Sequence, residues 1–313
     1  MIVKDMLELS VVICTHNPKL EFLKRTIDAI RHQSLNVEKW EFLIIDNGSK
    51  QPLENNLDIR WHPLGRLLKE EKVGLTQARI RAIMESKGGY ILFVDDDNCL
   101  DLKYLEIALN TMNNNPLLGM LGAGRILPDY EAAPPSEAED FMIMLALRNE
   151  TRSYFSNDIN WSRAIPFGAG MVIRRHLALD YVGSLKEREH AKKLGRAGSK
   201  LLSGEDVDMA LHACDKQYLV GVIPELKLTH IIPKSRLETG YLVRLAAGHA
   251  FSHYILGRMW GYRQDYPENR VLKKMRYFNN WLKSRGLSRL IFMAEHQAVE
   301  EARTAWNKSV AAK

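Results

Sequence analysis

Three consecutive aspartates, Asp95, Asp96 and Asp97, directly follow the apolar run Tyr90–Val94. Side chains alternate along an extended chain, so Asp95 and Asp97 share one side while Asp96 points away. Two hard oxygen ligands beside one pocket suit Mg²⁺ or Mn²⁺, which complete their shells with water and phosphate oxygens. The triplet therefore predicts a metal and diphosphate site. An acidic loop that caps a helix near Leu102 stays open as the alternative.

The elements that must position these aspartates alternate between strands and helices over the first hundred residues. Apolar runs predict buried strands at Leu9–Cys14, Glu41–Asp46 and Tyr90–Val94, and a further short strand at Ile59–Trp61. Helices are predicted from Asn17-Pro18 to about Ile30, with Asn17 as the N-cap, and over Leu75–Ser86. This order favours an α/β fold with ligands at the carboxyl ends of the strands, where Thr15, Asp46 and Asp95 lie.

Six short motifs occur in a fixed order along the chain. They are Val-Val-Ile-Cys-Thr-His-Asn-Pro18, Leu-Ile-Ile-Asp-Asn-Gly-Ser49, Gly74-Leu-Thr-Gln-Ala-Arg79, Phe-Val-Asp-Asp-Asp97, Gly168-Ala-Gly170 and Gly204-Glu-Asp206. The series resembles that of the family-2 glycosyltransferases, over roughly Leu9 to His230, about two-thirds of the chain. The resemblance implies a GT-A fold, with a mixed, mostly parallel sheet flanked by helices. It also implies a nucleotide-diphosphate sugar donor, most simply a UDP-sugar, and inversion at the anomeric carbon.

The resemblance also assigns roles to residues of the donor site. Thr15, Asn17 and Asp46 are expected at the nucleotide, and Arg79 at the diphosphate. Each of Asn17, Asp46 and Arg79 also has a purely structural alternative. Asn17 would be a helix cap, Asp46 would form a turn and Arg79 would lie on a solvated helix face. Together with Asp95, Asp96 and Gly170, whose missing side chain allows close approach to a sugar, these residues form the predicted donor-binding set. The predicted metal ligands are Asp97, Asp95 and His230, although His230 at a strand end also reads as structural.

Inversion requires a base on the acceptor hydroxyl, across the pocket from the metal. Asp206 is the candidate, with Glu205 as the second choice. The competing interpretation is a capping box in which Ser203 caps the helix and Asp206 reaches back. The basic run Lys186–Lys200 directly precedes this motif, and it reads equally well as a lid over the donor phosphates and as a solvated loop.

The domain organisation follows from these assignments. Residues 1–236 are predicted to form the catalytic domain, with a donor half over about 1–127, a crossing loop at Pro128–Pro135 and an acceptor half over about 136–236. Phe167–Ile173 and Leu226–His230 read as strands, and Glu205–Cys214 reads as a helix. Residues 237–313 form a helical extension, in which His249 and His253 are read as part of a helix face and not as a zinc site.

Composition and charge indicate the cellular location that is expected for the protein. The formal net charge is +6, and only Cys14, Cys99 and Cys214 are present, with no CxxC spacing. Neither a disulfide framework nor a zinc finger is indicated, and a cytoplasmic location is expected. The helical extension carries a set of basic residues spread over apolar stripes, which suggests contact with the inner face of the plasma membrane; a simple helical cap over the catalytic domain is the alternative. These residues are Arg244, Arg258, Arg263, Lys273, Lys274, Arg276, Lys283, Arg285 and Arg289.

The sequence thus predicts an inverting, metal-dependent glycosyltransferase that uses Mg²⁺ or Mn²⁺ and a glycan or lipid-linked acceptor. The expected pathway is cell-surface polysaccharide or glycoconjugate synthesis. A dinucleotide-dependent oxidoreductase is disfavoured because no GxGxxG turn follows the first strand. The same region has no glycine-rich phosphate loop of a sugar nucleotidylyltransferase. A non-catalytic scaffold for nucleotides or nucleic acid is the rival from another class, but a nucleic-acid partner is not expected because no recognisable binding motif is present.

Overall fold

The computed structural model describes residues 7–188, 190–196, 201–265 and 270–311. Its strands are β1 (Leu9–Thr15), β2 (Trp40–Asp46), β3 (Gly65–Lys69), β4 (Tyr90–Val94), β5 (Asn98–Leu100), β6 (Leu118–Tyr130), β7 (Arg148–Asn149), β8 (Tyr154–Ser156), β9 (Val172–Arg174) and β10 (Leu219–Ile232). Its α-helices are α1 (Leu20–Arg31), α2 (Leu75–Glu85), α3 (Tyr104–Asn114), α4 (Arg175–Ser184), α5 (Glu205–Asp215), α6 (Thr239–Met259), α7 (Arg270–Lys283) and α8 (Gly286–Ala311). Short 3-10 helices are η1 (Val37–Lys39), η2 (Ser136–Leu145), η3 (Ala191–Lys193) and η4 (Lys234–Leu237).

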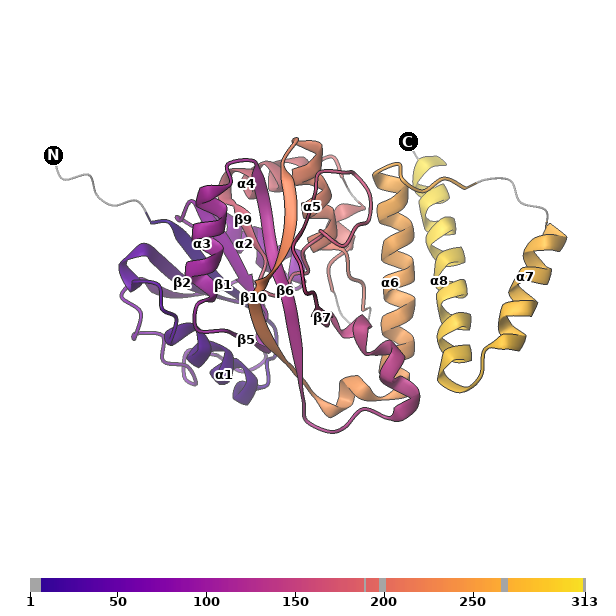
Figure 1. Ribbon diagram of the computed structural model, residues 1–313, viewed down its shortest axis with the longest axis horizontal. Helices are drawn as coiled ribbons and strands as arrows, with labels where there is room; N and C mark the ends of the chain where they lie inside the picture. The colour runs from indigo at the N-terminus through magenta and orange to yellow at the C-terminus, as the bar shows by residue number, and fades with distance from the viewer. Residues whose placement is uncertain (1–6, 189, 197–200, 266–269, 312–313) are drawn as a thin grey trace.

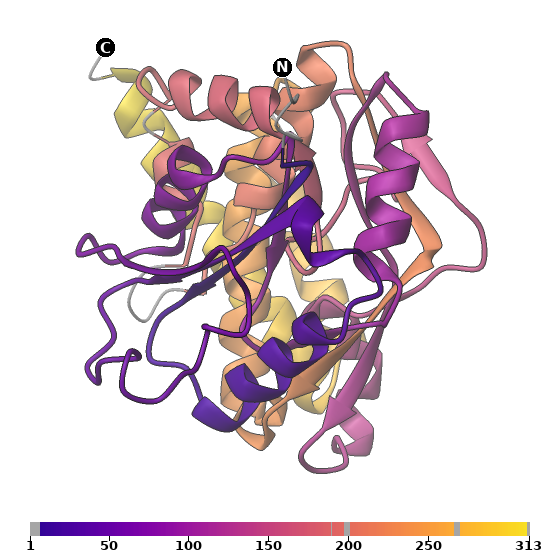
Figure 2. The same cartoon turned by 90° about the vertical axis from the view of Figure 1, so that its left-hand side faces the viewer.

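The strands form one mixed sheet in the order β3-β2-β1-β4-β9-β6-β10-β5, with β7 and β8 beside β6 and β10. The long registers are parallel: β1 pairs with β2 and β4, β2 with β3, and β6 with β10. The short strand β9 lies antiparallel between β4 and β6. Helices flank the sheet on both faces (Figures 1 and 2). The predicted α/β fold with a mostly parallel sheet is therefore confirmed.

Alternation along the central strands explains why helices cover both faces. Val12 belongs to a core shared with α2, α4 and α5, whereas Val11 and Ile13 belong to a core shared with α1 and α3. All three side chains are fully buried. Successive side chains of a strand point to opposite faces, so an unbroken apolar run needs cover on both sides.

Two local predictions are wrong. Ile59–Trp61 is not a strand, because Trp61 and His62 instead pack in a turn against Trp40, with ring centroids 6.1 and 4.3 Å from that of Trp40. The edge strand is β3, a few residues later. The first helix is not capped by Asn17: its N-cap is Lys19, and Asn17 adopts a positive φ of 51° in the loop before it.

Two further segments are shorter or longer than expected. The predicted strand Phe167–Ile173 begins only at Val172, because the chain turns through Gly168–Gly170 before it. The predicted crossing loop Pro128–Pro135 is partly strand, since β6 continues to Tyr130 beside Ile232 of β10. One sheet therefore runs through both proposed halves of residues 1–236.

The C-terminal helices stand beyond one edge of the sheet. Helix α6 lies next to α8, and α7 is outermost, against α8 (Figure 1). A third apolar core joins them to η2, through residues such as Met142, Leu242 and Ile291. Among the helices that the structure describes, none combines the length and apolar character needed to cross a bilayer.

Candidate active site

A cavity of about 1040 Å³ opens at the carboxyl ends of β1 and β4. Its polar side, which we call the strand-end wall, comes from the ends of strands and the loops after them, from α2 and η4, and from the start of α5. The residues of this wall that the argument uses are Thr15, Asn47, Arg79, Asp95, Asp96, Asp97, Arg196, Glu205, Asp206, His230 and Arg236. Parallel strands end at one edge of a sheet, which is why residues so distant in sequence meet here.

The three aspartates have different partners within the strand-end wall. Asp95 is 43% exposed, and its Oδ1 lies 3.9 Å from the Arg79 guanidinium. Asp96 accepts a hydrogen bond from the Thr15 hydroxyl. Asp97 is buried, with an Oδ2 that lies 2.9 Å from Nη1 of Arg236 and 3.6 Å from Nε2 of His230. Asp95 is thus the aspartate most open to a ligand, and Asp97 is held in an ion-pair network.

Burial and neighbouring charges move the pKa values of these acids apart. Burial and the charge of Asp97 raise the pKa of Asp96 to about 7, against the hydrogen bond from Thr15. Burial would also raise the pKa of Asp97, but His230 and Arg236 outweigh it and lower the value to about 2. Burial raises the pKa of Asp95, although Arg79 opposes the shift. Such divergent values are typical of a ligand site.

Arg79 is a buried residue, so the alternative of a solvated helix face is wrong. It is 5% exposed, and its Nη1 donates to Oε1 of Glu205 at 3.2 Å. The charges of Glu205 and Asp95 raise its pKa although burial lowers it. A Cβ on Gly168 would lie 2.5 Å from the Arg79 side chain, so the glycine makes room for the guanidinium. Arg79 therefore links α2, α5 and the end of β4.

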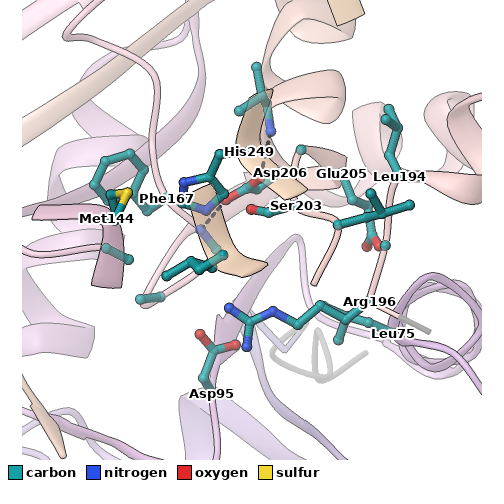
Figure 3. Close-up of a pocket in the computed structure, with 18 of the residues that line it drawn as sticks. Leu75, Asp95, Met144, Phe167, Leu194, Arg196, Ser203, Glu205, Asp206 and His249 are labelled. Carbon is teal, nitrogen blue, oxygen red and sulfur yellow. Dashed lines mark hydrogen bonds between the residues drawn. The ribbon is translucent and has the colours of Figure 1, made fainter. Parts of the chain in front are cut away.

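Glu205 and Asp206 are adjacent but differ in environment. Glu205 is 2% exposed and accepts from Thr76 Oγ1 at 2.7 Å as well as from Arg79, and burial raises its pKa. Asp206 is partly exposed and lies beside His249 (Figure 3). Its Oδ2 accepts from the Gly168 amide at 2.7 Å. Of the two acids, Asp206 is the one free to meet a substrate.

The capping box considered as the alternative role of Asp206 is wrong. The residue at the N-cap of α5 is Gly204, and neither it nor Ser203 caps the helix through a side chain. The second oxygen of Asp206, Oδ1, accepts from the amide of Val207 at 2.9 Å. The carboxylate is therefore fixed by backbone donors on two segments, the Gly168 amide and the first turn of α5.

Three predicted donor-binding residues, Asn17, Asp46 and Gly170, are not among the residues that line the cavity. Asp46 accepts from the Ser49 amide at 3.0 Å, which is the turn role considered as its alternative. Asn17 joins the first two loops, because its amide donates to Ser49 Oγ at 2.9 Å and its Oδ1 accepts from the Lys50 amide at 2.8 Å. Gly170 has a φ of 72°, and a Cβ there would lie 2.4 Å from the Tyr104 hydroxyl. These residues shape the loops, whereas Asn47 faces the cavity.

Several lining residues were missed in the sequence. Arg236 pairs with Asp97 from η4, and Arg196 points towards Asp95 (Figure 3). His249 and His253, read as a plain helix face, both line the cavity. The sequence features that could have indicated these residues are the basic run around Arg196 and the spacing of His249 and His253. Within that basic run, Arg188 pairs with the buried Asp208, and residues 189 and 197–200 lie outside the described part of the chain.

The opposite side of the cavity is helical and mainly apolar, although His249, His253, Glu295 and His296 of the same helices also line it. We call it the helical wall, and it consists of Ile143, Met144, Leu145, Tyr241, Leu245, Leu256, Phe292 and Val299 from η2, α6 and α8. The C-terminal helices therefore form part of the cavity lining, so they do more than cover the catalytic domain as the alternative of a helical cap supposes. Contact between α6 and the segment before Asp206 is close, since a Cβ on Gly248 would lie 2.1 Å from the Leu201 carbonyl oxygen.

No ready-made metal cage is found among residues 7–188, 190–196, 201–265 and 270–311, where no three His, Cys, Asp or Glu side chains gather suitably. Mg²⁺ seldom uses such a cage, because it takes one or two carboxylates together with phosphate oxygens. The chemistry of Asp95 and Asp97 fits that pattern. Nδ1 of His230 is buried and has no hydrogen-bond partner in the described chain.

Comparison with known proteins gives one family. The family model described as "Glycosyl transferase family 2" matches residues 10–178. An uncharacterized glycosyltransferase of Methanocaldococcus jannaschii is 23% identical over 86% of this chain and 85% of its own length. The glucosyl-dolichyl phosphate glucuronosyltransferase of Haloferax volcanii is 19% identical over 86% of this chain and 83% of its own.

A solved structure is similar in fold. The mannosyltransferase PcManGT of Pyrobaculum calidifontis, in complex with GDP-mannose and Mn²⁺, superimposes with a TM-score of 0.57 at 17% identity. The match covers 98% of this chain and 76% of that one. At this identity the likeness bears on the fold, and it supports the GT-A assignment.

Proposed function

Because the chain belongs to glycosyltransferase family 2, we propose that this enzyme transfers a sugar from a nucleotide-diphosphate sugar to an acceptor oxygen, with inversion at the anomeric carbon. The observation that carries the proposal is the cavity itself, whose lining brings together Asp95 from the end of β4 and Asp206 from the start of α5 (Figure 3). Family membership disfavours a non-catalytic scaffold and a sugar nucleotidylyltransferase. Cell-surface polysaccharide or glycoconjugate synthesis is the proposed setting.

The donor is proposed to lie along the strand-end wall. Thr15 ends β1 and Asn47 follows β2 at the proposed nucleotide end, and Arg79 and Arg196 supply positive charge near Asp95 for a diphosphate. Asn17, Asp46 and Gly170 act here by holding the loops and the turn in place. A UDP-sugar is the proposed donor; the similar mannosyltransferase was solved with GDP-mannose, so the base needs a direct test.

Mg²⁺ or Mn²⁺ is the proposed cofactor. Asp95 and Asp97 would hold it together with oxygens of the donor diphosphate. His230, 3.6 Å from Asp97, is the third proposed ligand, although the three side chains do not form a metal-binding cluster among the residues that the structure describes. When bound, such a cation neutralises charge that develops on the leaving diphosphate. Arg79 and Arg196 stabilise the same charge from the protein side.

Asp206 is the proposed catalytic base. Its two backbone hydrogen bonds, from Gly168 and Val207, fix the direction of its carboxylate. As the acceptor oxygen bonds to the anomeric carbon, its proton passes to Asp206 and the bond to the diphosphate breaks. Glu205 serves a different purpose, because its carboxylate is occupied by Thr76 and Arg79.

Peripheral contact with a membrane is proposed for α7. Its outward face is apolar, with Val271, Met275, Phe278 and Leu282 each between 52% and 63% exposed. Lys274 and Lys283 flank this face, which is the arrangement of a helix that lies in an anionic interface. Not every basic residue of the extension contributes: Arg263 lines the cavity, and Arg258 lies 3.9 Å from Asp265.

A donor screen tests the enzymatic proposal. Purified protein is incubated with UDP- and GDP-sugars, with Mn²⁺, Mg²⁺ or a chelator, and free nucleoside diphosphate is measured. We expect release from one donor class that the chelator abolishes, and Asp95→Asn is expected to weaken metal-dependent donor binding at least about tenfold. Donor binding that is equal with the cation and with the chelator would refute the metal assignment. Release of pyrophosphate instead would identify a nucleotidylyltransferase.

A further inference from the structure

The helical wall has an unusual composition for a surface that receives a sugar. Ile143, Met144, Leu145, Leu245, Leu256 and Val299 are aliphatic, and they outnumber the aromatic Tyr241 and Phe292. Ile143 is 69% exposed, so apolar surface reaches the rim of the cavity. Met144 lies beside Phe167 on the same side as Asp206 and His249 (Figure 3).

The position of this wall relates it to the acceptor. Arg79, Arg196 and the three aspartates occupy the strand-end wall, which leaves the space beyond Asp206 for the group that attacks. A free glycan carries hydroxyl groups on all its edges, and aliphatic side chains would leave them without hydrogen-bond partners. An unpaired buried polar group is costly, whereas a hydrocarbon chain on the same surface is favourable.

Polar side chains also line the helical side of the cavity, namely His249, His253, Arg263, Glu295 and His296. His249 is adjacent to Asp206, and Arg263 also lines the cavity, with its guanidinium 4.8 Å from the Tyr254 ring centroid. These groups suit a hydroxyl or phosphate head at the reacting end of an otherwise apolar molecule.

The apolar surface continues outside the cavity through α7. Phe292 and His296 line the cavity, and both contact Tyr277 of α7, with ring centroids 5.2 and 4.6 Å away. The other side of α7 bears the exposed apolar face of Met275 and Phe278. A chain that leaves the cavity on this side therefore meets the helix proposed to lie on a membrane.

We infer that the acceptor is an amphiphile whose hydrocarbon chain lies along the helical wall and whose hydroxyl or phosphate head lies at Asp206. The inference rests on the proposed function, since it names the acceptor of the same reaction. A hydroxyl head loses its proton to Asp206 as it bonds to the anomeric carbon. A phosphate head attacks through an oxygen that is already ionised, and in both cases the nucleoside diphosphate leaves.

Chain-length dependence of binding tests the inference. Hexyl, octyl and decyl phosphates, and the matching alkyl glucosides, are titrated calorimetrically below their micelle concentrations with UDP and Mn²⁺ present. If the chain is buried, affinity should rise about tenfold for each added pair of methylenes, in one head series or both. The two series distinguish a phosphate head from a hydroxyl head.

Two substitutions of nearly equal exposure localise the effect. Ile143→Glu places a charge on the helical wall, whereas Leu117→Glu alters a residue of similar exposure, 68%, in the turn before β6. We expect the chain-length dependence to weaken in Ile143→Glu and to stay intact in Leu117→Glu. Affinity that is independent of chain length, or an equal change in both variants, would overturn the inference.

The same titrations separate failure of the inference from failure of the proposed function. UDP and GDP binding are measured on each protein before the alkyl ligands are added. Normal nucleotide binding with a flat chain-length series rejects the amphiphilic acceptor alone. If affinity rises with chain length in a protein that binds no nucleotide, the cavity binds apolar chains but has no donor site. That result rejects both the proposed enzyme and this acceptor.

Discussion

The two walls of the cavity are built on different principles. In the strand-end wall, polar groups hold one another: Thr15 donates to Asp96, Arg79 to Glu205, and Arg236 pairs with Asp97. In the helical wall, aliphatic side chains from η2, α6 and α8 meet without such pairing. Preorganised charge suits a diphosphate that must leave, and an adaptable apolar surface suits a chain that only has to be held.

Asp206 lies where the two walls meet, and its replacement should have the largest effect. In Asp206→Asn we expect turnover to fall by about two to four orders of magnitude, the range for loss of acid–base catalysis. Donor and metal affinity should stay near wild type, because the residue acts on the acceptor. Transfer rate and donor affinity are measured on the same folded protein.

A control on the same helix shows whether the effect is specific. Asp215→Asn changes an exposed acid at the other end of α5, and it should leave turnover unchanged. Near-normal turnover in Asp206→Asn would move the base elsewhere, and the equivalent test on Glu205→Gln would then decide between the two acids.

Arg79 tests the charge pairing of the strand-end wall. In Arg79→Ala we expect a loss of about 3–5 kcal/mol in unfolding free energy, because Glu205 is left buried without its cationic partner. Affinity for nucleoside diphosphate should fall more than affinity for nucleoside, since the proposed ligand of Arg79 is phosphate. Urea unfolding and nucleotide titration measure the two effects.

Helix α2 provides a matched control for this prediction. Arg81 pairs with Glu85 at the surface, 3.1 Å apart, with the two side chains 38% and 32% exposed. Arg81→Ala should therefore cost only about 0.3–0.5 kcal/mol. A similar loss in both variants would mean that the Arg79–Glu205 pair is not stabilised by burial. An equal fall for nucleoside and nucleoside diphosphate would argue against a phosphate role.

The same contrast explains what the sequence could and could not predict. Asp95, Asp96, Asp97 and Asp206 border strongly apolar strands or a regular helix, so local periodicity placed them at strand ends and at a helix start. The burial of Arg79 was harder to predict from the sequence. A helical pattern does not tell which of Arg79 and Arg81 contacts Glu205, a residue 126 positions away from Arg79. Asn17 and Gly170 fit motifs, yet their contacts with Ser49 and Tyr104 give them roles in the backbone.

The residues of the helical wall could hardly be predicted from the sequence, because their meeting depends on tertiary structure. Ile143 and Met144 lie in a 3-10 helix that has no strong periodicity, and they reach the cavity only because η2 packs against α6 and α8. Arg236 likewise reaches Asp97 from a short turn of helix after β10. Pairings of this kind depend on how distant elements dock, and single-sequence patterns carry little information about docking.

The smallest expected effect concerns the outer end of the helical side, where α7 is proposed to contact a membrane. Phe278 is 58% exposed, and its transfer into an interface should contribute about 1.5–3 kcal/mol, which corresponds to roughly tenfold or more in partitioning. We therefore expect Phe278→Glu to reduce sedimentation with phosphatidylglycerol vesicles by about that factor. The wild type should bind phosphatidylcholine vesicles more weakly, because Lys274 and Lys283 favour anionic lipid. Leu127→Glu, at an exposed position on β6, is the control and should sediment like the wild type. Equal sedimentation with both lipids would exclude an anionic surface as the partner of α7, and a concentration-dependent dimer that Phe278→Glu abolishes would assign the apolar face to a second copy of the chain instead.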